Sequence, residues 1–285
     1  MKKKFNQLVT ATAMVLAMSA TNAMAVPVDQ FYFTQNAGWV NPLTDASTTT
    51  GFFGAGGLVL TMGSAVADPA GTFQSMSWKG TWDTNPSSIE INTFNSTTSA
   101  ATTSALGLTT FANGQWNANE WAVITELHQT NYVITGIFPN PLWIADALGS
   151  FRLFDDAPGG NLVFSDLNHP KRVSFYETPN LAACPSNVLG GDPCEDIYTV
   201  IQNDFASLTF WLNGQKYLVD FTLFPGPGTA VVPNGDDINV YTIEGNPGHS
   251  YINVAARWNP VPEPSTLALL GVALLGISFM RRKMI

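Results

Sequence analysis

The sequence predicts an all-β protein whose body is a β-sandwich or a jelly-roll-like fold. Alternating apolar and polar residues dominate between residues 26 and 260, and turn-forming residues separate these short stretches. Almost no segment of the body carries a helical apolar stripe with capping residues at its ends. Short strands divided by frequent turns are typical of two packed antiparallel sheets.

Individual strands follow from the same pattern. The clearest predicted hairpin covers residues 208–224, where Asn213-Gly214 supplies the positive φ of a tight turn. A second hairpin is predicted to turn at residues 245–248. The Ser/Thr/Ala-rich residues 95–110 are predicted to form a loop or a seam between subdomains. Further strands are predicted at residues 56–62, 75–82, 87–94, 121–134, 151–156, 162–167 and 171–178.

The N-terminus has the three parts of a secretory signal peptide. Lys2, Lys3 and Lys4 give a positive region, LVTATAMVLAM is a short apolar core, and Ala23-Met24-Ala25 places small residues at a cleavage site. Cleavage is therefore predicted between Ala25 and Val26. The signal peptide would cover residues 1–25 and the exported body residues 26–260.

The C-terminal end carries an apolar segment followed directly by basic residues. Residues 266–280 contain no charge, and Arg281, Arg282 and Lys283 come next. A transmembrane helix needs roughly 17–25 apolar residues, so this segment is close to the lower limit. The basic residues would hold their end in the cytoplasm, which leaves the body outside.

The residues before this segment complete a recognisable signal. Val261-Pro262-Glu263-Pro264, the apolar run and the basic end together resemble a PEP-CTERM sorting signal over residues 261–285. The resemblance implies a transient inner-membrane anchor that an exosortase, a membrane transpeptidase-like enzyme, recognises and removes. It implies delivery of the body to the cell surface or extracellular matrix of a Gram-negative bacterium. The two prolines fit this role, because they favour an extended chain around Glu263.

The body itself resembles the THxN family of PEP-CTERM proteins. The resemblance rests on ELHQTNYVI and on FYETPNLAACPSNVLGGDPCEDIYTV. Asn131 takes the Asn place of that signature, whereas His128 and Gln129 stand where the family has Thr and His. The family implies no established catalytic activity.

The charge of the body excludes some classes of partner. Of twelve Lys and Arg, six lie in the two ends, and of twenty-one Asp and Glu, only Glu263 does, so the body carries six positive and twenty negative charges. A net charge near −14 argues against binding to nucleic acid or to anionic membrane surfaces, because both attract Lys and Arg.

The two cysteines are predicted to form a disulfide. Cys184 and Cys194 are separated by nine residues that include two Pro and two Gly, so a closed loop is sterically easy. In an exported protein a disulfide is the default, and the alternative metal site lacks a nearby His or a second Cys pair. The cross-link would stabilise the fold by about 2–3 kcal/mol.

No motif of catalysis or of zinc binding occurs. No G-x-S-x-G surrounds a serine, and no H-E-x-x-H or C-x-x-C pair is present, so neither a catalytic residue nor a metal ligand is predicted. His128, His169 and His249 are interpreted as surface or structural residues. No cofactor is expected, and the alternative is calcium at the acidic turns of Asp155-Asp156 or Asp236-Asp237.

The predicted role is structural, adhesive or associated with exopolysaccharide in a biofilm matrix, without enzymatic activity. Eight tryptophans could stack on sugar rings from an exposed sheet face or could fill the sandwich core, and the core is the favoured interpretation. The alternative function is a secreted glycan hydrolase with a carboxylate pair, for which Glu126 and Glu177 are the candidates.

Overall fold

The structure is a computed structural model. It describes residues 28–43, 58–81, 83–94, 116–134, 141–157, 159–178, 188–190, 194–201, 205–245 and 247–262. The predicted signal peptide, the loop at 95–110 and the apolar segment at 266–280 lie outside these residues. Within them, no helix has the length and apolar character needed to cross a membrane.

The chain forms two compact units. The large unit comprises residues 29–208 and 218–259. The described part of the small unit consists of Val28, the hairpin Thr209–Tyr217 and residues 260–262. The predicted body of residues 26–260 therefore falls mostly into the large unit, with one hairpin in the small one.

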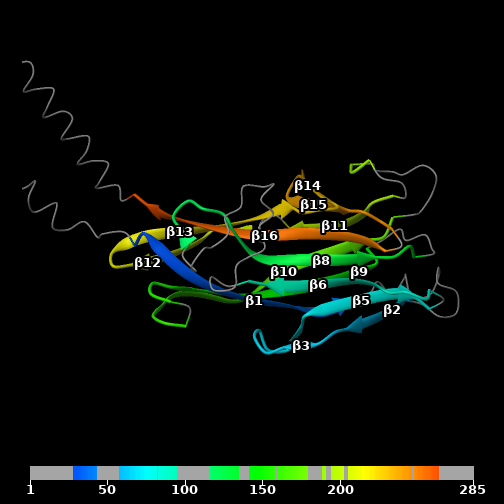
Figure 1. The fold of residues 1–285 in the computed structure, drawn as a ribbon, viewed down its shortest axis with the longest axis horizontal. Coiled ribbons are helices and arrows are strands. Elements are labelled where there is room, and N and C mark those ends of the chain that lie inside the picture. Colours follow the sequence, from blue (N-terminus) through cyan, green and yellow to red (C-terminus); the bar gives the residue numbers. More distant parts are fainter. Residues whose placement is uncertain are drawn as a thin grey trace, which may run out of the picture. The chain divides into compact units, whose positions relative to one another are not determined.

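Antiparallel strands make up both sheets of the described chain, and Figure 1 labels them. The first sheet has the order β14-β15-β11-β10-β9-β1-β4-β3, and β7 also pairs with β1. Its strands are β1 (Gln30–Leu43), β3 (Ala65–Val66), β4 (Thr72–Phe73), β7 (Trp116–Asn117), β9 (Trp143–Phe154), β10 (Leu162–Tyr176), β11 (Asp196–Ile201), β14 (Thr229–Asn234) and β15 (Asp237–Thr242).

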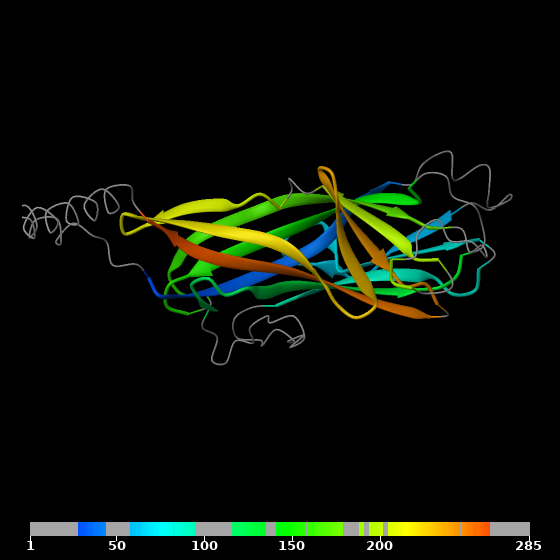
Figure 2. The ribbon, with the colours of Figure 1, turned by 90° about the horizontal axis from the view of Figure 1, so that it is seen from above.

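The second sheet has the order β12-β13-β16-β8-β6-β5-β2. Its strands are β2 (Leu58–Met62), β5 (Ser75–Gly80), β6 (Ser87–Thr93), β8 (Ala122–Asn131), β12 (Leu208–Leu212), β13 (Gln215–Pro225) and β16 (Gly248–Val261). Figure 2 shows the long strands β1, β9 and β10 of the first sheet running together, in blue and green.

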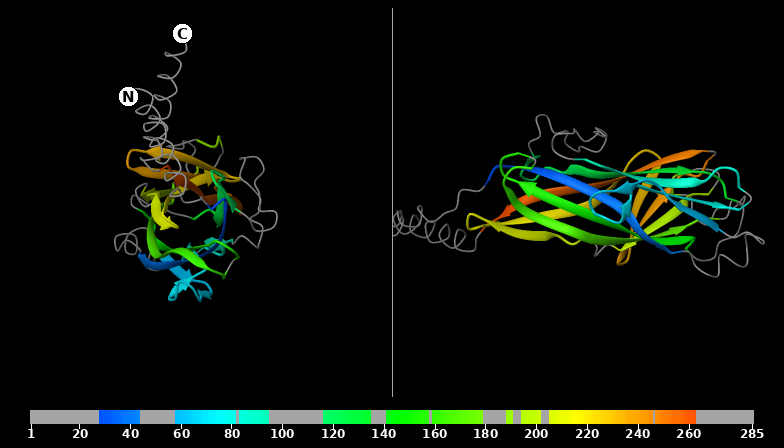
Figure 3. Two further views of the ribbon diagram at one scale, coloured as in Figure 1. Left: turned by 90° about the vertical axis from the view of Figure 1, so that its left-hand side faces the viewer. Right: turned by 90° about the horizontal axis from the view of Figure 1, so that it is seen from below.

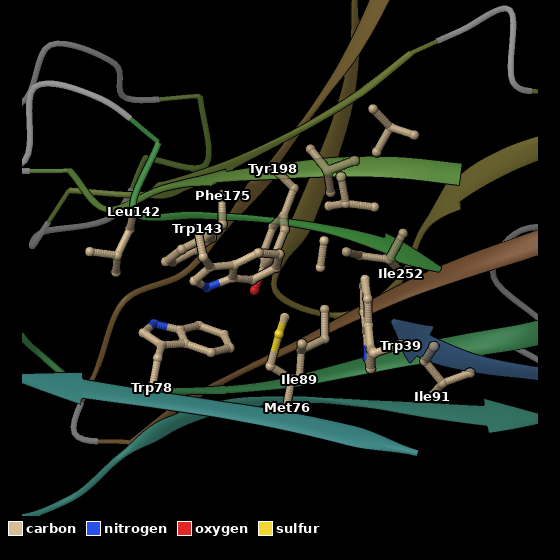
Figure 4. Packing of buried hydrophobic residues seen from close by; sticks show 14 of the residues in the cluster. Trp39, Met76, Trp78, Ile89, Ile91, Leu142, Trp143, Phe175, Tyr198 and Ile252 are labelled. Carbon is tan, nitrogen blue, oxygen red and sulfur yellow. The ribbon is translucent and has the colours of Figure 1, made fainter. Parts of the chain in front are cut away.

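The core of the large unit lies between the two sheets, one of which curls like half of a barrel (Figure 3). Trp143 from β9 contacts Trp78 from β5 across the gap, with ring centroids 5.2 Å apart, and stacks on Phe175 of its own sheet. Figure 4 shows Tyr198 and Met76 in the same layer of side chains. Inward-facing residues alternate with outward-facing ones along these strands, which is the pattern that burial of one sheet face imposes.

The all-β sandwich predicted from the sequence is thus confirmed. The Asn213-Gly214 hairpin forms as predicted between β12 and β13, and both turn residues have positive φ, at 50° and 80°. The two strands predicted at 162–167 and 171–178 form one strand, β10, because it pairs with β9 along its length through two register shifts.

The prediction of a hairpin that turns at residues 245–248 is wrong. β15 pairs with β11 and β14 in the first sheet, whereas β16 pairs with β8 in the second. The connection after Thr242 therefore passes from one sheet to the other. The tight turn of this region lies earlier, between Asn234 and Asp237, where Gly235 has a φ of 64°.

Candidate functional site

Three carboxylates lie together inside the large unit, at one end of the core. Glu177 follows β10, Asp196 begins β11, and Glu244 lies on the connection after β15. These three strands are neighbours in the first sheet. One oxygen from each carboxylate lies within 4.8 Å of the others. The side chains are almost inaccessible, because Glu177, Asp196 and Glu244 are 2%, 0% and 7% exposed.

The strand pattern explains why these acids point inward. Glu177 is two residues beyond the core residue Phe175, and Asp196 is two residues before the core residue Tyr198. Side chains two apart share a sheet face, so the acids continue the rows of aromatic residues that fill the core. We call Glu177, Asp196 and Glu244 the acidic cluster.

Asn131 ties the acidic cluster to the second sheet. Its amide Nδ2 donates to Asp196 Oδ2 at 2.5 Å, and its Oδ1 accepts a hydrogen bond from the Ser87 hydroxyl at 3.0 Å. Ser87 is on β6 and Asn131 ends β8, so a buried polar chain runs from the second sheet to β11 of the first. The backbone amide of Thr178 donates to Asp196 Oδ1 at 3.0 Å.

Burial and mutual repulsion change the ionisation of the cluster. Loss of water raises the pKa of Glu177 well above its ordinary value, and the charges of Asp196 and Glu244 raise it further. Burial raises the pKa of Asp196 to about 7, although the hydrogen bonds from Thr178 and Asn131 oppose the rise. The charged groups that shift the pKa of Glu177 are all acids, including Asp83.

Several polar groups in this part of the core lack a hydrogen bond within the described chain. Neither carboxylate oxygen of Glu177 has a hydrogen-bond partner by distance and angle, although the backbone of Ile134 lies close enough to oppose the rise of the Glu177 pKa. The Tyr198 hydroxyl and the amide group of Gln129 also lack one, and both side chains are buried. Such groups in native interiors are normally satisfied by water or by an ion.

The acidic turns that suggested calcium have a different character. Asp156 accepts hydrogen bonds from the backbone amides of Ala157 and Asn161, and these hydrogen bonds lower the pKa of its exposed carboxyl. Asp155 accepts one from the Asn161 side chain. Asp236 lies exposed in the β14–β15 turn, and Asp237 begins β15. The structure thus uses these acids as turn residues and brings three other acids together.

The two glutamates considered for glycan hydrolysis lie apart. Glu126 neighbours Leu127, which packs against the core, so Glu126 faces the opposite side of β8. Burial alone raises the pKa of Glu126. Glu177 faces the core from the other sheet and is closed off from solvent. The described structure therefore offers no shared cleft for this pair.

Most tryptophans fill the core, as the favoured interpretation of the sequence predicted. Five are fully buried: Trp39, Trp78, Trp116, Trp143 and Trp258. Trp121 is partly exposed and stacks under the guanidinium of Arg257, 4.6 Å from its ring centre. Trp211 is 63% exposed and lies on β12, while Trp82 is outside the described residues.

A second cluster of polar side chains lies on the outer face of the second sheet. His128 Nε2 and His249 Nδ1 are 3.2 Å apart, which is hydrogen-bond distance. The Tyr251 ring stacks on His128 at 4.5 Å. Burial lowers the pKa of His128, the charge of His249 lowers it further, and Glu90 opposes the shift. These histidines are surface residues that contact each other, and the side chain of His169 lies outside the described residues.

A largely apolar cavity of about 120 Å³ lies within the large unit. Ile89 and Leu127 line it from the second sheet, and Phe151 and Val173 from the first. Lys171 and Asp166 are charged residues that also line the cavity. Its chemistry suits a small apolar molecule, and it presents no cluster of catalytic groups.

The two ends of the body meet the same hairpin in the small unit. The backbone amide of Val28 donates to the Tyr217 hydroxyl at 2.8 Å, and the Gln215 side chain donates to the carbonyl of Val261 at 2.6 Å. Gln215 and Tyr217 are both on β13. The chain just after the predicted signal peptide and the first residue of the predicted sorting signal are therefore both fixed to one strand.

The other predicted site residues are only partly described. Val261 ends β16 and Pro262 is exposed, whereas Glu263, Pro264, Arg281, Arg282 and Lys283 lie outside the described residues, as do Ala25 and Val26. Cys194 is 1% exposed, and the described part of the chain contains no free cysteine. Cys184 is outside it, so the Cys184–Cys194 disulfide stays a prediction.

Comparison with known proteins identifies a motif in the C-terminal part of the chain. No curated protein matches the chain. The family model of the PEP-CTERM protein-sorting motif matches residues 260–283. The resemblance of the body to the THxN family is not shown by this match. Residues 260–283 thus carry a PEP-CTERM sorting motif, which implies an exported, surface-associated protein that an exosortase processes.

Proposed function

We propose that this protein is a structural or adhesive component of the cell surface or extracellular matrix, associated with exopolysaccharide. In this proposal the signal peptide directs export, and the sorting tail holds the protein briefly in the inner membrane. An exosortase then removes the tail and the body passes to the surface. The observation that carries the proposal is the sorting motif at residues 260–283, which starts at the end of β16.

The anchoring of both ends supports this order of events. Val28 and Val261 are each hydrogen-bonded to a residue of β13. Cleavage before Val28 and beyond Pro262 would leave these bonds in place, so the body can lose both ends without losing a strand. Such a body suits a protein that is folded before its tail is cut.

The positions of the carboxylates and of one tryptophan in the described chain support a non-enzymatic role. The three carboxylates of the acidic cluster are buried, out of reach of a glycan chain. Trp211 is the exposed tryptophan of the described chain and offers a ring face for stacking on sugars. A hydrolase would need a different, exposed carboxylate pair.

Replacement of the sorting motif tests the proposal. In the native host, the variant Pro262→Ala/Glu263→Ala/Pro264→Ala is expected to stay uncut in the membrane fraction. A control, Pro233→Ala/Asp236→Ala, changes one proline and one acid at exposed positions in and just after β14 and is expected to be processed normally. Normal release of the motif variant would contradict exosortase sorting.

The exopolysaccharide association has its own test. The processed protein is incubated with exopolysaccharide purified from the same host and the mixture is sedimented. Co-sedimentation that Trp211→Ala reduces, and Val232→Ala at another exposed position does not, would support binding through Trp211. Absence of co-sedimentation for the unchanged protein would leave a structural role without glycan binding.

A further inference from the structure

The acidic cluster has the features of a cation site that has been built into the core. We propose that Glu177, Asp196 and Glu244 bind a single calcium ion, which braces the end of the sandwich where the two sheets are joined through Asn131. The proposal concerns the body alone and does not depend on how the protein is sorted.

The first argument is the crowding of like charge. Three carboxylates lie within 4.8 Å of one another and are between 0% and 7% exposed. Carboxylates repel each other strongly at this distance when water is excluded, and isolated buried charges are costly. The charged neighbours that act on Glu177 are Asp196, Glu244 and Asp83, so their fields add to the repulsion. A divalent cation turns this repulsion into attraction.

The second argument comes from a buried polar atom that lacks a hydrogen bond. Tyr198 is 1% exposed, and its hydroxyl has no hydrogen-bond partner in the described chain. It projects from β11 on the same face as Asp196, two residues away, and both Asp196 and Glu177 act electrostatically on it. A buried hydroxyl of this kind needs an acceptor, and an ion-bound carboxylate or an ion-bound water supplies one.

The third argument is the position of both oxygens of Glu177. Neither accepts a hydrogen bond from the described chain, although the side chain is buried. Asp196 differs, since it already accepts from Asn131 and Thr178 and is held in place by them. A carboxylate with two unpartnered oxygens can bind calcium in the bidentate mode, and the fixed carboxylate beside it can supply a further oxygen.

The donor atoms select calcium among the common cations. The cluster offers oxygen only, whereas zinc sites in proteins are dominated by Cys and His. Magnesium keeps several waters in a strict octahedron, which suits an open site better than a buried one. Calcium takes six to eight oxygens in flexible geometry, including bidentate carboxylates and amide oxygens. The Gln129 amide oxygen is a buried, unpartnered group of the latter kind on β8, two residues before the Asn131 that donates to Asp196.

The location gives the ion a structural task. Its ligands come from the ends of β10 and β11 and from the crossing between β15 and β16, which changes sheet. Asn131 connects the same point to β8. A calcium ion here would fix the crossing against both sheets, and extracellular calcium modules bind with dissociation constants of about 10⁻⁴–10⁻³ M.

The test uses the full-length chain in detergent, freed of metal with a chelator and then titrated with CaCl₂ by isothermal calorimetry. We expect one calcium ion per chain and a rise of the unfolding temperature with calcium concentration. Tb³⁺ in place of calcium should luminesce when the protein aromatics are excited, because Tyr198 is two residues from Asp196 on the same face of β11 and the ring centroids of Tyr198 and Trp143 are 5.9 Å apart.

Variants assign the site. Glu177→Gln keeps the shape of the side chain and should weaken calcium binding by at least the roughly 10- to 100-fold that loss of a group supporting a ligand costs. Without calcium this variant should unfold at a higher temperature than the unchanged protein, because it removes an acid whose burial beside two other acids is unfavourable. The control Asp236→Asn removes one exposed acid and should leave both binding and its stoichiometry unchanged.

The alternative state of the cluster is one in which the carboxyl groups share protons and bind no ion. A folded, metal-free protein that shows neither heat of binding nor a calcium-dependent unfolding temperature would establish this alternative and overturn the proposal. Equal calcium binding by Glu177→Gln would also overturn it. Magnesium binding in preference to calcium would contradict the choice of ion.

Discussion

The amide of Asn131, at the end of β8, donates a hydrogen bond to the carboxylate of Asp196, at the start of β11, and so joins the two sheets of the large unit inside the core. The two residues come from the two segments that carried the resemblance of the body to the THxN family. ELHQTNYVI contains Asn131, and the acidic pair after Cys194 contains Asp196. Segments 65 positions apart in the chain therefore meet at one buried polar contact.

Removal of this contact should destabilise the protein. Asn131→Ala removes the side-chain donor to Asp196 Oδ2 and one of the two acceptors of the Ser87 hydroxyl, while the Thr178 amide and the Tyr132 carbonyl keep their hydrogen bonds. We expect a loss of about 1–3 kcal/mol in the free energy of unfolding, measured by urea denaturation of the calcium-loaded protein. The exposed control Asn234→Ala should change it by less than about 0.5 kcal/mol. Equal stability of both variants would show that the contact is dispensable.

The tryptophans allow a matched comparison of core and surface. Trp143 is fully buried and contacts Trp78 and Phe175, whereas Trp211 is mostly exposed. Trp143→Ala is expected to cost about 3–5 kcal/mol or to prevent folding, because it opens a cavity between the sheets. Trp211→Ala should cost less than about 0.5 kcal/mol by the same denaturation measurement. A large cost for Trp211→Ala would indicate that its ring is covered in solution.

How much of this fold the sequence could predict depends on the range of the interactions. The β12–β13 hairpin was predicted correctly, because Asn213-Gly214 is a local signal with a direct conformational cause. The turn at residues 245–248 was misassigned, because Gly and Pro indicate a change of direction without indicating which sheet the next strand joins. That choice is made by the pairing of β16 with β8, far away in the chain.

The sequence does not predict that the three acids of the acidic cluster lie together, for the same physical reason. Glu177, Asp196 and Glu244 lie on separate segments, and only the order β15-β11-β10 brings them together. From the sequence, Glu177 is a candidate for a different chemistry, as half of a hydrolytic pair with Glu126. The alternation of inward and outward residues along the strands does contain a signal. Glu177 lies two residues after Phe175 and Asp196 two residues before Tyr198, so both acids face inward like these core residues. An acid at an inward position of a strand is a candidate for a buried site.

The histidine pair on the outer face predicts a pH dependence. His128 lies between Glu90 of β6 and His249 of β16, with Tyr251 stacked on it, and its pKa is lowered by burial and by His249. A histidine with a lowered pKa binds fewer protons folded than unfolded, so its contribution to stability is present above its ordinary pKa of 6.5 and is lost as the pH falls below it. In His249→Gln the pKa of His128 should rise toward 6.5, as NMR titration of its ring protons would show. An unchanged His128 pKa in this variant would indicate that burial alone sets it.

The predicted disulfide can be checked chemically. Unfolded but unreduced protein should take up no alkylating reagent, and reduced protein should take up two equivalents, since the chain has two cysteines. Reduction of the predicted Cys184–Cys194 disulfide should lower the free energy of unfolding by about 2–3 kcal/mol. Because Cys194 stands two residues before Asp196, we expect reduction to weaken calcium binding as well. Alkylation without reductant would disprove the disulfide.

The most direct test of the sorting account is the intact mass of the protein recovered from the medium and from the membranes of its native host. The account predicts a released species that begins at Val26 and lacks the apolar segment with its basic end, residues 267–285. A released or surface-bound species that keeps this segment would contradict exosortase processing and would make the protein an ordinary membrane-anchored domain.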